Sequence, residues 1–147
     1  MSKIISYRGV IPSGQQVKIQ LSTIQGKVGY KINKFQVINK QPNEQTVELQ
    51  GQVYKTDQTG IITNVIDFSD ANLLAVTTYV NSSSSAYPQS DIIIFDNEKF
   101  NQDIYVVGID MGGDSREVNY YLELETMSLS DLESTMLTLK NLRTITS

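Results

Sequence analysis

The sequence contains no cysteine, no histidine and no tryptophan. Without cysteine the chain has no disulfide framework, no thiolate nucleophile and no thiolate metal site. Histidine is the only side chain whose unperturbed pKa lies near neutrality, so its absence excludes Ser-His and Cys-His catalysis and most zinc and haem sites. An enzyme built from this chain would need carboxylates, lysine, tyrosine or a borrowed cofactor. We therefore expect a protein that binds and assembles, with no catalytic residue, no cofactor and no metal.

Long apolar runs and early acidic residues are also missing. No run approaches the roughly 20 residues that cross a bilayer, which predicts one soluble domain with no membrane contact. Residues 1–43 contain seven basic side chains and no acidic one, whereas residues 44–147 contain five basic and sixteen acidic ones. The simpler interpretation is that basic early strands pair with acidic later strands across a sheet; the alternative is a dipolar surface that docks neighbouring subunits. Because no Lys/Arg cluster is interleaved with aromatic residues, nucleic-acid binding is not expected.

The sequence does contain a repeated two-residue apolar period. Val17, Ile19 and Leu21 alternate with polar residues, and the same alternation recurs at residues 47–53 and 118–124. This alternation is typical of strands that bury one face. Further apolar segments predict strands at residues 4–11, 29–38, 61–66, 73–80, 91–95 and 104–109. Turn-forming residues separate these segments at intervals of about ten residues, which favours an all-β sandwich or jelly roll of about eight strands.

The end of the chain has a helical period instead. Ser130 and Glu133 have the spacing of a capping box, and an apolar stripe at helical spacing follows, formed by Leu129, Leu132, Met136, Leu139 and Leu142. We expect residues 1–128 to form the sandwich and residues 129–147 to form one amphipathic helix that packs on, or extends from, the same domain. The default expectation is that the stripe packs against the sheet. The alternative is that it lies in a groove of a neighbouring chain.

Candidate interface residues come from strand faces, one loop and the helix. Tyr30 and Tyr120 fall on apolar strand faces and are expected in the core, whereas tyrosines on polar faces are expected at an interface. The candidate contact residues are Lys18, Lys31 and Lys34 on polar strand faces, Tyr54 and Tyr121 on polar faces, Ser82, Ser83 and Tyr87 in a serine-rich loop, and Leu132, Met136 and Leu139 on the helix.

Acidic residues occur in pairs near three predicted turns. The pairs are Asp67 with Asp70, Asp96 with Glu98, and Asp110 with Asp114. Oxygen-rich loops can hold calcium, but none of these has EF-hand spacing, so capping of turns by aspartate is the simpler explanation. Glycoside hydrolysis would need two carboxylates on either side of a sugar, and no other feature of the sequence supports it.

Two segments in the second half of the chain resemble a known class of protein. Residues 92–109 read Ile-Ile-Ile-Phe-Asp-Asn-Glu-Lys-Phe-Asn-Gln-Asp-Ile-Tyr-Val-Val-Gly-Ile, and residues 119–127 read Asn-Tyr-Tyr-Leu-Glu-Leu-Glu-Thr-Met before the helix. Together they resemble small structural proteins of marine tailed bacteriophages. The resemblance is strongest over residues 92–145 and covers core and turn residues. It implies a place in the virion, assembled in the host cytoplasm, through contacts with the major capsid protein or with neck or tail subunits.

The leading hypothesis is therefore a capsid decoration or cement subunit that forms homo-oligomers or binds other virion proteins. A neck, connector or tail component is the nearest alternative. A carbohydrate-binding module for a host-surface glycan is the alternative from another class of function. It predicts exposed aromatic residues that converge on a groove, whereas assembly predicts sheet edges or a helix stripe buried between chains.

Overall fold

The computed structural model of the chain describes residues 3–23, 26–42, 44, 46–82, 89–96 and 98–146, with helix side chains described as far as residue 140. This part of the chain forms eight strands and one helix. They are β1 (Lys3–Ile11), β2 (Gln15–Ile19), β3 (Val28–Asn39), β4 (Val47–Tyr54), β5 (Leu73–Asn81), β6 (Gln89–Ile94), β7 (Ile104–Asp110), β8 (Val118–Ser128) and α1 (Asp131–Thr146).

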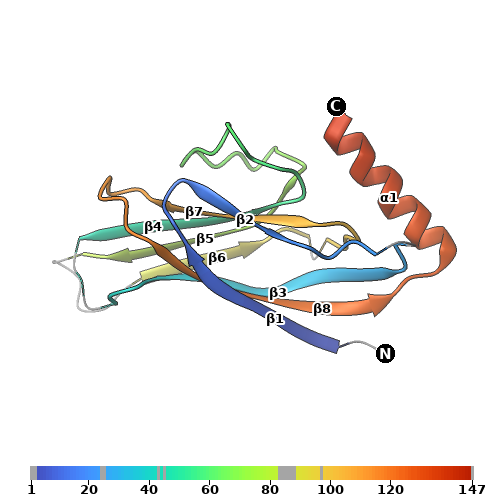
Figure 1. Ribbon diagram of the computed structural model, residues 1–147, viewed down its shortest axis with the longest axis horizontal. Coiled ribbons are helices and arrows are strands. Elements are labelled where there is room, and N and C mark those ends of the chain that lie inside the picture. Colours follow the sequence, from blue (N-terminus) through green and yellow to red (C-terminus); the bar gives the residue numbers. More distant parts are fainter. Residues whose placement is uncertain are drawn as a thin grey trace.

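The strands form two antiparallel sheets that face each other, and α1 rises from one end of the body (Figure 1). One sheet has the order β1-β8-β3, and the other has the order β2-β7-β4-β5-β6. The chain passes from one sheet to the other at each connection between β1 and β4, and again between β7 and β8. The predicted all-β sandwich with a C-terminal helix is confirmed.

The core lies between the sheets because strand side chains alternate between two faces. Leu122 on β8 pairs in register with Phe35 on β3, and both side chains are fully buried. Each fully buried aliphatic or phenylalanine side chain stabilises the fold by roughly 1.5–3 kcal/mol. Gly51 on β4 gives the large ring room, because a Cβ atom at this position would lie 2.8 Å from Phe35 Cζ. Tyr30 and Tyr120 are buried, as the sequence predicts.

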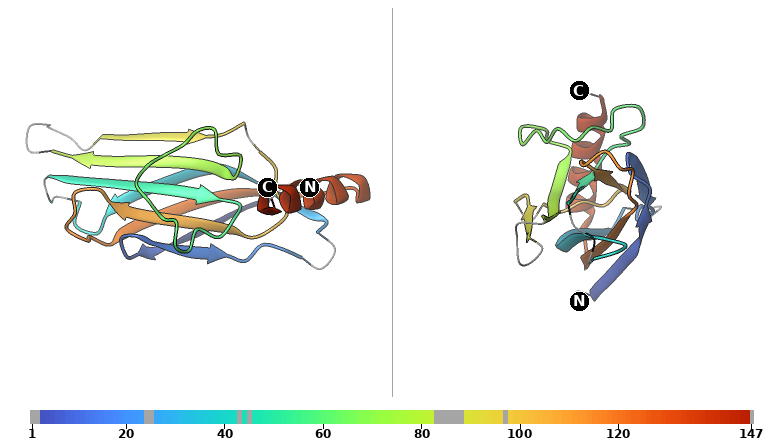
Figure 2. Two further views of the ribbon diagram at one scale, coloured as in Figure 1. Left: turned by 90° about the horizontal axis from the view of Figure 1, so that it is seen from above. Right: turned by 90° about the vertical axis from the view of Figure 1, so that its left-hand side faces the viewer.

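Residues 55–72 form an irregular segment that lies over the outer face of the five-stranded sheet (Figure 2). Ile62 and Ile66 pack onto a second apolar cluster there, which includes Tyr54 and Val107. The strand predicted at residues 61–66 is therefore wrong. β4, the strand that this segment follows, already pairs with β5 and β7, so the segment cannot form a hairpin partner beside it. Side chains satisfy two of its carbonyl groups instead: Gln50 donates to Asn64 O at 3.0 Å and Gln52 to Thr63 O at 3.0 Å.

The helix begins with the predicted capping box. The Ser130 N–H donates to Glu133 Oε1 at 3.2 Å, and the Glu133 N–H donates to Ser130 Oγ at 3.2 Å. Leu129, just before the cap, is buried against Gly29 on β3. In the described residues we find no helix that could span a membrane.

Many of the early basic residues form ion pairs with later acidic residues. Lysines from the first 43 residues meet acidic residues from the last part of the chain in four ion pairs, which are Lys18–Asp103, Lys27–Asp131, Lys31–Glu125 and Lys40–Glu117. Pairing across a sheet is confirmed for Lys31 on β3 and Glu125 on β8, whereas each of the other three pairs includes a residue outside the strands.

Candidate interaction site at the C-terminal helix

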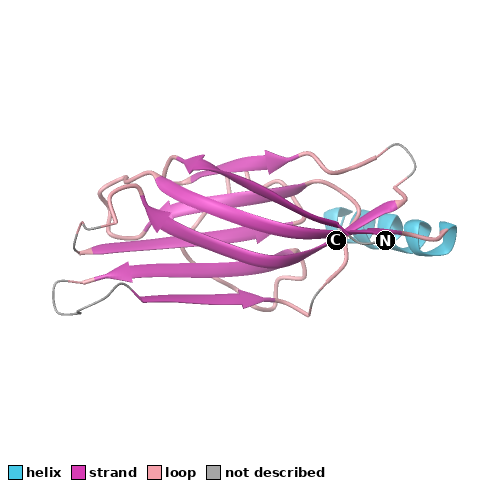
Figure 3. Cartoon of the chain, turned by 90° about the horizontal axis from the view of Figure 1, so that it is seen from below, coloured by secondary structure: helices cyan, strands magenta, loops and turns pink. Residues whose placement is uncertain are grey.

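Polar contacts hold α1 against the end of the sandwich. Asn101, which is 1% exposed, donates from Nδ2 to Gly26 O at 2.9 Å and to Thr138 Oγ1 at 3.1 Å. Lys27 Nζ lies 2.9 Å from Asp131 Oδ1 in the first turn, where the helix dipole favours a negative charge. One side of the helix is thereby fixed to the body. Figure 3 shows α1 projecting at one end of the two sheets.

A second attachment joins the last described turns of α1 to the body. The Glu98 carboxylate lies between Lys55 Nζ at 2.9 Å and Lys140 Nζ at 2.7 Å. The Lys55 side chain is only 5% exposed, so this charge depends on its partner. Burial raises the pKa of Glu98, but the hydrogen bonds from Lys140 and Lys55 outweigh it, and the net effect is a lowered pKa. Glu98 is therefore ionised at neutral pH.

Three residues of the predicted apolar stripe face away from the body, whereas Leu129, just before the helix, is buried. Leu132 is 69% exposed, Met136 60% and Leu139 52%. At 3.6 residues per turn these side chains lie opposite Ser134 and Thr138, which face the sandwich. The default expectation that the stripe packs on its own sheet is therefore wrong for these three residues; the Leu142 side chain lies outside the described residues. The sheet end is polar where the helix meets it, and Asn101 and Glu98 bind the polar side of the helix.

A groove of about 520 Å³ separates α1 from the segments around residues 68–71 and 95–99. Phe68 and Phe95 meet edge to face across one wall, with ring centroids 4.9 Å apart. The groove also carries charge of both signs, from Asp70, Asp96, Glu98, Lys99 and Lys140. Its volume falls within the range of small-molecule sites. Sequence reasoning placed Asp70, Asp96 and Glu98 near turns but missed both phenylalanines. The available signal was Phe68, an apolar residue within the turn sequence Asp67-Phe68-Ser69-Asp70.

Three predicted contact residues, Lys31, Lys34 and Tyr121, lie on the outer face of the three-stranded sheet. Lys34 Nζ lies 5.8 Å from the centroid of the Tyr121 ring, within the range of a cation–π contact. The Tyr121 hydroxyl donates to Glu123 Oε1 at 3.1 Å. Two shallow depressions, of about 380 and 180 Å³, flank this tyrosine.

The other predicted contact residues lie elsewhere. Lys18 is on β2, in the other sheet, and pairs with Asp103 at 3.4 Å. Tyr54 is 6% exposed and donates to Gln52 Oε1, so its assignment to an interface is wrong; residues 55–72 cover the face on which it lies. Ser82 is partly buried, and Ser83 and Tyr87 fall outside the described residues.

Three of the six acidic turn residues cap their own turns. Asp67 accepts from the Ser69 N–H at 2.9 Å, Asp70 from the Asn72 N–H at 2.9 Å, and Asp110 from the Gly112 N–H at 2.9 Å. The turn-capping interpretation is confirmed for these three aspartates. In the described part of the chain, no group of three or more acidic side chains is placed to hold a metal ion.

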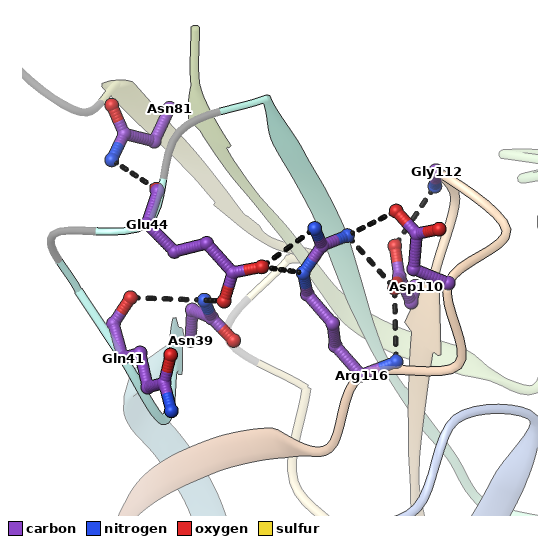
Figure 4. A network of polar contacts seen from close by, with 8 residues as sticks. Asn39, Gln41, Glu44, Asn81, Asp110, Gly112 and Arg116 are labelled. Carbon is purple, nitrogen blue, oxygen red and sulfur yellow. Dashed lines mark hydrogen bonds and ion pairs between the residues drawn. The ribbon is translucent and has the colours of Figure 1, made fainter.

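Figure 4 shows the polar network that surrounds Arg116. Its guanidinium donates to Glu44 Oε1 at 2.7 Å, to Asp114 Oδ2 at 2.7 Å and to buried Asp110 at 3.4 Å. The hydrogen bonds from Arg116 and then from Asn39 lower the pKa of Glu44. Because these residues come from the β3–β4 and β7–β8 connections, the network ties the two loops together. It lies at the end of the sandwich away from α1 (Figure 1).

No protein-family model and no curated protein matches this sequence. The function is therefore inferred from the fold and from these surfaces.

Proposed function

We propose that this chain is a structural protein of a bacteriophage virion, a capsid decoration or cement subunit that stabilises the shell through contacts with neighbouring proteins. One observation carries the proposal. α1 is attached to the body by polar contacts on one side and leaves Leu132, Met136 and Leu139 exposed on the other. A helix that is fixed in place with its apolar face outward is suited to dock against another chain.

The strand order supports the same class of function. A jelly roll pairs its first, eighth, third and sixth strands in one sheet and its second, seventh, fourth and fifth in the other. The order here is the same except that β6 pairs with β5 and so extends the five-stranded sheet. Jelly rolls occur in viral capsid proteins and in lectins. Fold analogy favours a class of function and cannot by itself choose between members.

Composition and copy number make modest contacts sufficient. Ser, Thr, Asn and Gln supply 49 of the 147 residues, so the surface relies on neutral hydrogen-bonding groups that suit hydrated interfaces. A subunit repeated many times on a shell gains avidity by multivalency. Each copy then needs an interface of only about 1,000 Å².

The proposal is tested by locating the chain in virus particles. Antibodies raised against the purified chain are applied to density-gradient fractions of phage particles grown in the presence of their host, and are imaged with gold labels. We expect the chain to co-sediment with particles and the label to lie on the shell. Label confined to the neck or tail would show that the chain is a neck or tail component and not a capsid decoration subunit. A chain found only in the soluble fraction, with no label on particles, would contradict a virion role.

A second candidate function, carbohydrate binding, is favoured by the groove beside α1. Exposed Phe68 and its partner Phe95 provide an aromatic wall, and Asp70 and Asp96 supply hydrogen-bond acceptors nearby. Aromatic rings pack well on the apolar faces of sugars. Binding to an array of bacterial surface glycans, lost in Phe68→Ala and kept in Ile61→Ala, would support this candidate. Ile61 is the matched control because it is equally exposed on the same segment.

A further inference from the structure

The helix α1 and the outer face of the three-stranded sheet lie in different parts of the molecule. In Figure 1, β1, β3 and β8 form the lower layer, whereas α1 rises on the side of the other sheet. Tyr121 also lies seven residues before Ser128, the end of β8, which corresponds to about 24 Å along the strand. α1 therefore cannot reach this face within its own chain, and only another molecule can join the two surfaces.

The sheet face presents a row of apolar side chains across three strands. Val10 on β1 and Ile38 on β3 both pair in register with Asn119 on β8. They are 41% and 44% exposed, respectively. Tyr121 stands beside this row, and the two depressions that flank it are lined partly by Val10 and by Ile38. Arg8 on β1 pairs in register with Tyr121. Exposed aliphatic residues around a tyrosine and an arginine are typical of the centre of an interface.

The spacing of the helix stripe matches this row. Leu132 and Leu139 are seven residues apart, which places them about 10.5 Å apart along the helix. Val10 and Ile38 are two strand spacings apart, or about 9.6 Å. A helix laid across the strands would therefore set one leucine on each aliphatic residue. Met136, between them, would lie over Asn119 and beside Tyr121, which is two residues farther along β8. Thioether contacts with aromatic rings are favourable.

Charge fixes the direction of the helix on the sheet. The first turn of α1 is acidic: Asp131 is paired with Lys27 of its own chain, and Glu133 has no ion-pair partner among the described residues. On the β1 side of the sheet, Arg8 is exposed and has no ion-pair partner among the residues that the structure describes. On the β3 side, Lys40 is already paired with Glu117, and Lys34, which lies over the Tyr121 ring, pairs in register with Glu123, farther from the Val10–Ile38 row. The acidic turn therefore fits over β1, with Leu132 on Val10 and Leu139 on Ile38.

We propose that α1 of one copy docks across the outer face of the three-stranded sheet of a second copy, with Leu132 on Val10, Leu139 on Ile38 and Met136 beside Tyr121. The proposal rests on the proposed function, since it names another copy of this chain as one of the neighbours. The two surfaces differ, so the contact is heterologous and joins copies head to tail. Such contacts close into a ring if the rotation allows and otherwise extend as a filament.

Cross-linking between two single-cysteine variants tests this contact, because the chain has no cysteine of its own. Thr135→Cys lies beside the stripe, and Asn119→Cys lies between Val10 and Ile38. Mixed and treated with a short bismaleimide, the two variants are expected to form a heterodimer. Ser90→Cys, exposed on β6 in the other sheet, is the matched control and should not link to Thr135→Cys. Helix-to-helix dimers of Thr135→Cys alone, equal linking to the control, or no linking in any mixture would each overturn the proposal.

Sedimentation of the unmodified chain supplies an independent test. We expect the average mass to rise with concentration, and the combined Leu132→Ser, Met136→Ser and Leu139→Ser changes to raise the dissociation constant at least about tenfold. Changes of Ile61 and Val65 to serine, on another exposed segment, should leave it unaltered. A chain that stays monomeric up to about 1 mM would overturn self-docking. If a monomeric chain is still found on virus particles, the proposed function stands and only self-docking is wrong. If the chain forms oligomers but is never found on particles, the proposed function is wrong and self-docking stands.

Discussion

At the scale of single residues, the Arg116 network separates a structural carboxylate from a peripheral one. Asp110 and Asp114 both accept from Arg116 Nη1, but the Asp110 side chain is 0% exposed and the Asp114 side chain is 63% exposed. Asp110 also accepts from the backbone N–H groups of Gly112 and Arg116. Asp110→Ala leaves these donors unpaired and should lower the free energy of unfolding by about 1.5–3 kcal/mol. Asp114→Ala should cost at most about 1 kcal/mol. Urea unfolding measures both, and equal losses would contradict the assignment.

Gly51 allows a close approach that no other residue type permits. A Cβ atom there would lie 2.7 Å from Val37 Cγ1 and 2.8 Å from Phe35 Cζ, inside van der Waals contact. Gly51→Ala should therefore destabilise the fold by about 1–3 kcal/mol through overpacking. Denaturant unfolding is the measurement, and a matched test adds Phe35→Leu, which should recover part of the loss. An alanine variant as stable as the parent would show that the two sheets can move apart freely.

Individual tyrosines mark the limit of what alternation can predict. Tyr30 and Tyr120 fall on the apolar side of their strands and are buried, as expected. Tyr54 falls on the polar side of β4 and is buried as well. The alternation correctly places Tyr54 on the outer face of its sheet. It cannot show that residues 55–72 fold back over that face, because the alternation of one strand carries no information about which other segment packs on it.

At the scale of elements, the sequence predicts type and position better than environment. Strands with strict alternation are confirmed because alternation records one buried and one exposed face. The apolar run at residues 61–66 has the composition of a strand, but it packs as an irregular segment on the face of a sheet. Composition alone does not distinguish a strand from such a covering segment. For α1 the capping box and the stripe predict the helix correctly. They do not show whether the stripe packs on its own domain or on another chain, because both require apolar residues at the same helical spacing.

The exposed stripe of α1 should be almost neutral for the stability of the isolated chain. Substitutions at exposed sites usually change the free energy of unfolding by less than about 0.5 kcal/mol. Leu132→Ser or Met136→Ser should therefore fall within that limit, whereas Leu124→Ala, at a fully buried position, should cost about 2–5 kcal/mol. Thermal unfolding of the three variants at low protein concentration checks this. A large loss in the helix variants would mean that the stripe packs on its own domain.

The attachment of α1 through Glu98 should weaken in acid. Burial raises the pKa of Glu98, but the hydrogen bonds from Lys140 and Lys55 lower it by more than burial raises it. The pKa in the folded state therefore lies below the ordinary 4.5. A group whose pKa is depressed on folding contributes stability above its unfolded value and loses it as the pH falls through its folded value. Glu98→Gln should thus be less stable than the parent at neutral pH, and the difference should shrink below about pH 4.5. Unfolding midpoints measured from pH 7 to pH 3 test this, and a difference independent of pH would exclude an ionic role.

At the scale of the whole molecule, the candidate site depends on contacts between distant segments. The groove beside α1 is formed by residues near 70, near 97 and near 137, and no sequence spacing relates them. The pairing of basic early segments with acidic later ones is different, because the charge imbalance is visible in the sequence. The sequence therefore predicts that the two halves of the chain meet. Only the structure brings Phe68 and Phe95 to one wall and turns the stripe outward.

Head-to-tail docking makes a prediction about mixtures that symmetric docking does not. A helix-defective variant, with Leu132, Met136 and Leu139 changed to serine, keeps an intact sheet face. A face-defective variant, Val10→Lys with Ile38→Lys, keeps an intact helix. Each alone should remain monomeric, because every contact needs both surfaces. Mixed in equal amounts they should form a dimer and nothing larger, since that dimer retains one functional contact and no further one. Native mass spectrometry distinguishes the outcomes. Self-association of the face-defective variant alone would instead indicate that two helices pack on each other.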